Sequence, residues 1–203
     1  VGRGLAFQLA DALGALPAGD GAHHVAALDP ADRAVLGRHG VRFGTEMVYV
    51  ELLLRSDALR FRALLWAVRH GRDTPALPSA RRLAKVIEVD RDLPASFYAA
   101  LGFFVADGVA LRADRLERIA AAARRSSRNG PFVADDRFAA VAGVEPGALR
   151  RLLTALGYRA VIADGVETFV ARPRRRRETA AGRSAHPPRE GHPFAKLREL
   201  KLA

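Results

Sequence analysis

A chain of 203 residues, 49% of them apolar, is long enough to bury a hydrophobic core as one large domain or two small ones. It has no cysteine, which excludes disulfides, thiolate zinc sites and cysteine nucleophiles and is typical of a reducing, cytoplasmic interior. No run of eighteen apolar residues occurs, so we expect no membrane partner, and the net charge of +11 favours a polyanionic one.

The first half, residues 1–95, is predicted to form a helical accessory domain. Leucines recur there at helical spacing, which predicts a helix over residues 4–16. The segment Gly19 to Gly21 then breaks this helical pattern. Asp29 followed by Pro30 is typical of an N-cap and a first helical position, so a second helix is predicted to begin there and to stop at Gly40.

The remainder of this half alternates between short elements and connections. Residues 41–44 and 47–50 are rich in β-forming residues and predict a strand or an extended pair. Asp57 is expected to cap a third helix that runs to about His70. Residues 71–95 contain three prolines and are typical of a surface connection.

Two stretches of the chain repeat one plan. Residues 93–109 and 145–166 each predict a short helix that is closed by Leu-Gly-aromatic and followed by a hairpin turned on Asp-Gly. Glycine is favoured just past a helix because it adopts positive φ, and Asp-Gly suits a two-residue type I′ turn. Only the second copy has another helix and a short turn before it, so only that copy predicts a helix-turn-helix.

Residues 96–171 are therefore predicted to form a helix and hairpin followed by a winged-helix-like domain. Its predicted elements are an amphipathic helix over 114–125, a short helix capped by Asp135 or Asp136, a helix over 146–156, and a hairpin of residues 158–163 and 166–171. This order is typical of a winged helix with a β-hairpin wing, and an ordinary packing module is the alternative. The expected fold class is α+β, mostly helical.

The residue pattern provides no catalytic centre, cofactor site or metal site. Nothing matches the phosphate loop GxxxxGK[ST], and the glycines lie singly at turns. The adjacent His23 and His24 point in different directions on any regular element and have no carboxylate in a ligand pattern. Glu117, between Arg115 and Arg118, is interpreted as a solvated charge on a helix face.

Three groups of arginines are candidate nucleic-acid contacts. Arg150 and Arg151 lie on the predicted recognition helix, with a solvated face as the alternative. Arg124, Arg125 and Arg128 close the preceding helix, with complementation of its dipole as the alternative. The third group follows directly from the hairpin and would track phosphates as a flexible arm. It consists of Arg172, Arg174, Arg175, Arg176 and Arg177.

Residues 172–203 differ in character from the body of the chain. They hold ten Lys or Arg against three Glu, a net +7, so that only +4 belongs to residues 1–171. Few apolar residues occur there, which predicts a flexible tail, with solubilising charge as the alternative to polyanion binding. At its end Phe194, Leu197 and Leu200 share one helical face and predict a short partner-docking helix.

Four segments together resemble a known family. In this order, His39–Gly44, Arg112–Arg118, Leu156–Arg159 and Pro193–Leu197 resemble the region behind the motor in alphaproteobacterial superfamily 2 ATP-dependent helicases, which are related to the RNA helicase of the mitochondrial degradosome. The resemblance implies a parent protein whose RecA-like motor, with its ATP and Mg²⁺, lies outside this chain. Its motifs are turns and caps, so only the domain role is carried over.

The expected function is that of a nucleic-acid-binding accessory domain of such a helicase, with RNA or single-stranded or junction DNA and the motor domains as partners. A free-standing winged-helix regulator would require a dimer surface or an effector pocket. A protein-interaction module would use apolar helix faces and the terminal helix to dock a partner such as a nuclease.

Overall fold

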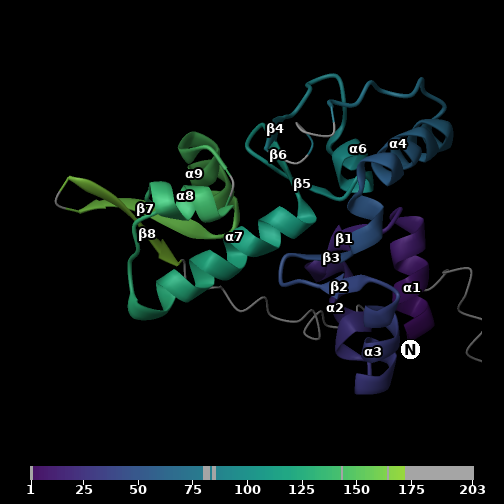
Figure 1. The fold of residues 1–203 in the computed structure, drawn as a ribbon, viewed down its shortest axis with the longest axis horizontal. Helices are drawn as coiled ribbons and strands as arrows, with labels where there is room; N and C mark the ends of the chain where they lie inside the picture. The colour runs from purple at the N-terminus through teal and green to yellow at the C-terminus, as the bar shows by residue number, and fades with distance from the viewer. Residues whose placement is uncertain (1, 80–82, 84–85, 143, 164, 172–203) are drawn as a thin grey trace, which may run out of the picture. The chain divides into compact units, whose positions relative to one another are not determined.

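The structure is a computed structural model that describes residues 2–79, 83, 86–142, 144–163 and 165–171 (Figure 1). These residues all belong to one compact unit, residues 1–172. The fold is α+β: within the described residues, helices pack with three small antiparallel sheets. The boundary predicted near residue 95 falls inside that unit, and the predicted tail lies outside the described residues.

The amino-terminal part, predicted to be a helical domain with a strand or extended pair at residues 41–44 and 47–50, contains a three-stranded sheet. The predicted pair is confirmed as β2 (Val41–Phe43) and β3 (Met47–Val50), whereas the third strand, β1 (Ala15–Pro17), was not predicted. The sheet has the strand order β1-β3-β2 and is antiparallel throughout. Buried Leu5, Leu9, Leu16 and Val48 form a core between this sheet and the helices. The elements are α1 (Gly2–Asp11), β1 (Ala15–Pro17), α2 (Ala18–Ala26), α3 (Pro30–Arg38), β2 (Val41–Phe43) and β3 (Met47–Val50).

Two local predictions in this part fail for identifiable reasons. The helix predicted over residues 4–16 ends at Asp11, because Leu13 and Gly14 have φ of 55° and 98° and turn the chain into β1. The Gly19 to Gly21 segment lies inside α2 and does not interrupt a helix. A Cβ at Gly21 would lie 2.8 Å from Leu16 Cδ1, so this glycine permits close packing of α2 on the core.

Of the two N-caps predicted for α3 and α4 (Ser56–His70), the first is confirmed and the second is wrong. The Asp29 carboxylate accepts a hydrogen bond from the Asp32 amide at 2.6 Å, so the predicted N-cap of α3 is confirmed. After the 3-10 helix η1 (Glu51–Leu54), α4 (Ser56–His70) has Arg55 at its N-cap position, and Asp57 lies in its first turn. A carboxylate there still complements the positive end of the helix dipole.

The first copy of the repeated plan is confirmed as a helix followed by a hairpin. α6 (Ala95–Ala100) leads into β5 (Phe103–Ala106) and β6 (Val109–Arg112), and Asp107 and Gly108 have φ of 42° and 75° in the turn. The prediction of a simple connection before α6 is wrong in one respect. Two of its residues form β4 (Ile87–Glu88), which pairs with β6 and extends the hairpin to three strands.

The predicted winged-helix-like region, residues 113–171, contains the second copy and follows the predicted element order closely. Its elements are α7 (Ala113–Ser126), the 3-10 helix η2 (Ser127–Asn129), α8 (Asp136–Ala142), α9 (Pro146–Ala155), β7 (Tyr158–Ala163) and β8 (Val166–Ala171). The Asp135 carboxylate accepts from the Phe138 amide at 2.8 Å and so caps α8. Phe132, just before α8, pairs with Phe169 of β8 through two backbone hydrogen bonds of 3.0 and 2.7 Å.

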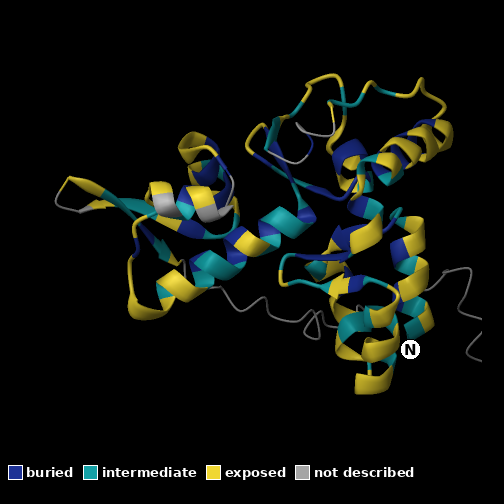
Figure 2. Cartoon of the chain, in the orientation of Figure 1, coloured by how far each residue is buried: buried dark blue, intermediate teal, exposed yellow. Residues whose placement is uncertain are grey.

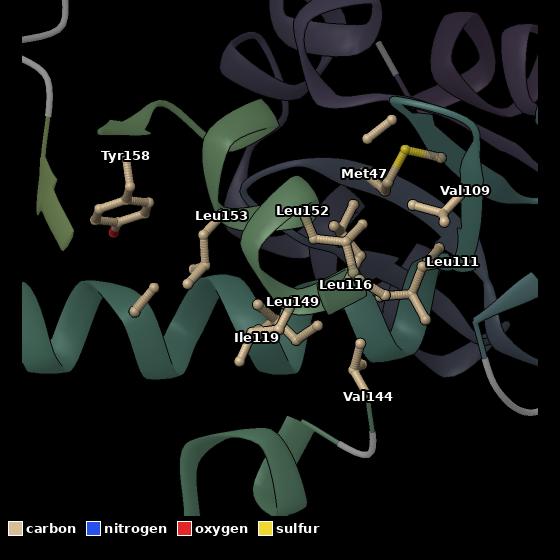
Figure 3. Packing of buried hydrophobic residues seen from close by; sticks show 14 of the residues in the cluster. Met47, Val109, Leu111, Leu116, Ile119, Val144, Leu149, Leu152, Leu153 and Tyr158 are labelled. Atoms are coloured by element: carbon tan, nitrogen blue, oxygen red, sulfur yellow. The ribbon is translucent and has the colours of Figure 1, made fainter. Parts of the chain in front are cut away.

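One hydrophobic core joins residues 113–171 to the amino-terminal sheet. Leu149, Leu152 and Leu153 of α9 are at most 1% exposed and lie toward Leu116 and Ile119 of α7 (Figure 3). The same cluster includes residues of β1 and β3 and the ring of Tyr158. The two halves of residues 1–172 therefore share buried apolar surface.

Arg62 on α4 is the one charged side chain in the buried class among the described residues, with 2% of its surface exposed. Its Nη1 donates to the Leu53 carbonyl oxygen at 2.9 Å, and no group in the described residues accepts from its Nε or Nη2. Burial lowers the pKa of this guanidinium to about 10. The core therefore holds a cation that is incompletely hydrogen-bonded.

Replacing Arg62 with methionine is expected to raise the free energy of unfolding by about 1–3 kcal/mol, because the desolvation cost of a buried, incompletely bonded cation exceeds the gain from one hydrogen bond. Urea denaturation followed by circular dichroism measures the change. A loss of more than about 1 kcal/mol would show that the cation stabilises the fold.

Candidate nucleic-acid interface

The predicted contact helix α9 is held with one face buried and one face exposed. Pro146 occupies its first turn, and Ala148, Leu149, Leu152 and Leu153 form the buried face. Because helical residues four apart share a face, Arg150 and Thr154 lie together on the exposed side. Figure 2 shows exposed positions along α9 and on the neighbouring β7–β8 hairpin.

Both predicted arginines of α9 have partners within the unit. Arg150 Nε lies 3.0 Å from Glu167 Oε1 of β8, and the two side chains are 63% and 39% exposed. Arg151 Nη1 donates at 3.2 Å to the carbonyl oxygen of Asp107, in the turn of the first hairpin. These contacts attach α9 to the two hairpins, so part of the hydrogen-bonding capacity of each guanidinium is already used.

The interpretation of Glu117 as a solvated charge is wrong. Its carboxylate accepts from the amides of Thr45, Glu46 and Met47 at 3.0, 2.7 and 2.8 Å, and from the Thr45 hydroxyl at 3.1 Å. One side chain of α7 therefore satisfies three consecutive backbone donors of the β2–β3 turn. A Cβ at Gly44 would overlap Glu117 Cδ and lie 2.6 Å from the Met47 carbonyl oxygen, so the turn requires glycine there.

Arg124 contacts the same β2–β3 turn as Glu117, so its role is not limited to complementing the helix dipole. Its Nη1 donates to the Thr45 hydroxyl oxygen and lies 3.4 Å from Glu46 Oε1. In contrast, Arg125 and Arg128 are exposed, and within the described residues neither guanidinium has a hydrogen bond or ion pair. The predicted group of Arg124, Arg125 and Arg128 is thus divided into one structural residue and two available cations.

Another ion pair lies at the start of α7. Arg112 contacts Asp114 through Nε at 2.6 Å and Nη2 at 2.9 Å, and both side chains are about one-fifth exposed. Burial by itself would raise the pKa of Asp114, but the hydrogen bonds and charge of Arg112 outweigh it and hold that pKa below its ordinary value. Asp114 is therefore an ionised structural partner at neutral pH.

The other predicted sites have simple outcomes. Arg172, Phe194, Leu197 and Leu200 lie outside the described residues, as do Arg174, Arg175, Arg176 and Arg177. The rings of His23 and His24 pack edge to face, with 5.4 Å between their centroids. The described residues contain no group of three or more histidine and carboxylate side chains placed to hold a metal ion, and no described helix is both long and apolar enough to cross a membrane.

Sequence reasoning found the arginines of α7 and α9 but missed their partners. Glu117 and the turn it anchors are about 70 residues apart in the chain, and Arg151 and Asp107 are separated by 44. Gly44 next to Thr45 signals a tight turn, but nothing local identifies the carboxylate that completes it. Comparison of the chain with models of protein families, with curated proteins and with solved structures returned no match.

Proposed function

We propose that this chain is a nucleic-acid-binding accessory region of an ATP-dependent helicase, with a winged-helix unit at residues 113–171 and a basic tail. The helicase context rests on the resemblance of the four sequence segments described above. The observation that carries the binding function is the order of α7, α8, α9 and the β7–β8 hairpin, which is typical of winged-helix units. The net +7 of the residues that follow supports an anionic ligand.

Contacts around the hairpin support the same proposal. Phe132 pairs with β8 and adds a third extended segment to the hairpin, and Tyr158 of β7 and Phe169 of β8 are buried. A hairpin fixed in this way projects from the helices without relying on its own marginal stability. Because the buried rings are unavailable for stacking on bases, we expect charge to dominate the binding.

The direct test is fluorescence anisotropy of the full chain with labelled single-stranded RNA, single-stranded DNA and a DNA junction. Saturable binding with little sequence preference is expected, because phosphate contacts carry no sequence information. Binding to none of the three ligands at low salt would exclude the proposed function.

The chain by itself is expected to release no phosphate from ATP in the presence of single-stranded RNA, because no phosphate-binding loop occurs in the sequence. A phosphate-release assay on repurified chain measures this. Turnover above background that copurifies with the chain would contradict the prediction and indicate a catalytic site.

A second candidate function, docking of an apolar helix from a protein partner, is favoured by one observation. Phe61, Leu64, Leu65 and Val68 of α4 are 60%, 45%, 37% and 72% exposed and recur at helical spacing. If docking is the function, Leu65→Glu and removal of residues 190–203 should each abolish partner capture and leave nucleic-acid binding unchanged.

A further inference from the structure

The exposed face of α7 carries a row of arginines. Ala113, Leu116, Ile119, Ala120 and Ala123 of this helix are buried, which fixes its inner face. Arg118 and Arg125 are exposed, and because they are seven residues apart they lie on the same face, two turns from each other. Between them lie the small side chains of Ala121 and Ala122. Arg128 continues the series in η2.

These cations are available to a ligand, unlike their neighbours. Within the described residues, the side chains of Arg118, Arg125 and Arg128 make no hydrogen bond or ion pair. The nearest carboxylates in sequence are already engaged, since Asp114 is held by Arg112 and Glu117 by the β2–β3 turn. The arginines of α9 are instead bonded to β8 and to the first hairpin. The positive charge available on α7 and α9 therefore lies on α7.

The spacing of the row fits a nucleic-acid backbone. Seven residues at 1.5 Å each separate Arg118 from Arg125 by about 10.5 Å along the helix axis. Stacked nucleotides rise about 3.4 Å per phosphate along one strand, so these two arginines match phosphates about three nucleotides apart. η2 also contacts β8, which places Arg128 beside the hairpin.

We propose that Arg118, Arg125 and Arg128 on α7 and η2 form the main phosphate-binding surface of the folded unit, ahead of the arginines on α9. This inference rests on nucleic-acid binding as the proposed function. It assigns the ligand class as the sugar-phosphate backbone of a strand that lies along α7. The arginines of α9 then serve mainly to fix α9 against the two hairpins.

The test compares full-length variants with equal reductions in charge. Arg118→Ala with Arg125→Ala is the test variant, and Arg38→Ala with Arg60→Ala, two exposed arginines of α3 and α4, is the matched control. Each pair lowers the net charge by the same amount, so only a local contact separates them. Anisotropy with labelled single-stranded RNA is measured at several salt concentrations.

The α7 variant is expected to reduce the slope of log affinity against log salt by about 1.4, or roughly 0.7 for each phosphate that is no longer neutralised, and to weaken binding about tenfold at low salt. The control should change the slope by less than half as much. Arg118→Lys with Arg125→Lys keeps the charge and should keep the slope. Equal effects of the α7 and control pairs, or a lysine variant as weak as the alanine variant, would overturn the inference. Absence of binding by the unmodified chain would instead overturn the proposed function.

Discussion

Replacing Glu117 with alanine is expected to lower the free energy of unfolding by about 2–4 kcal/mol, the largest loss from any single polar side chain described above. The change removes one carboxylate that accepts four hydrogen bonds from Thr45, Glu46 and Met47. It leaves the two partly buried amides of Glu46 and Met47 without an acceptor, and unsatisfied donors cost more than the bond itself contributes. Urea denaturation followed by circular dichroism measures the change.

The adjacent Arg118 provides the control for this stability experiment, because it lies on the same helix but is exposed. Arg118→Ala is expected to change stability by less than about 0.5 kcal/mol. Gly44→Ala tests the same anchor from the other side and should also destabilise the fold, since a Cβ there would lie 2.6 Å from the Met47 carbonyl oxygen. A loss below about 0.5 kcal/mol for Glu117→Ala would mean that the anchor does not hold the turn in solution.

Replacing Arg174, Arg175, Arg176 and Arg177 together with alanine is expected to have the largest effect on binding. Each neutralised phosphate releases counterions, so the salt slope should flatten by up to about three units on single strands. Affinity should fall alike for all sequences, because backbone contacts do not read bases. Arg150→Ala with Arg151→Ala should cost less, since both side chains already bond within the unit.

The measurement for the tail is anisotropy over a salt series with two unrelated RNA sequences. Chains with and without the four substitutions are compared at equal concentration. If the substituted chain kept both affinity and slope, the charge of the tail would serve solubility alone, and docking through apolar surfaces would become the favoured function.

The elements with local signals were predictable from the sequence. The hairpin of β7 and β8 has its predicted bounds, and Gly157 after α9 has the positive φ of 93° that the Leu-Gly-aromatic pattern predicted. Asp29 and Asp135 cap their helices as expected. In each case the residue that determines the conformation lies within a few positions of the backbone that it controls.

What was missed depends on contacts between distant segments. β1 is three residues long and exists because it pairs with β3, more than thirty residues later, so periodicity over residues 4–16 favoured one long helix. Gly21 lies in a helix because close packing on Leu16 outweighs the low helix propensity of glycine. Likewise, the sequence shows where arginines occur, and only the fold distinguishes Arg124, tied to the β2–β3 turn, from Arg125, exposed to solvent.

We propose that this chain binds nucleic acid mainly through its arginines. The most direct measurement is the affinity of the unmodified full chain for a labelled single-stranded RNA as a function of salt. Log affinity is expected to fall linearly with log salt, with a slope of about −3 or steeper, as when four or more phosphates are neutralised. Binding that did not weaken as salt was raised, or no binding at low salt, would contradict the claim.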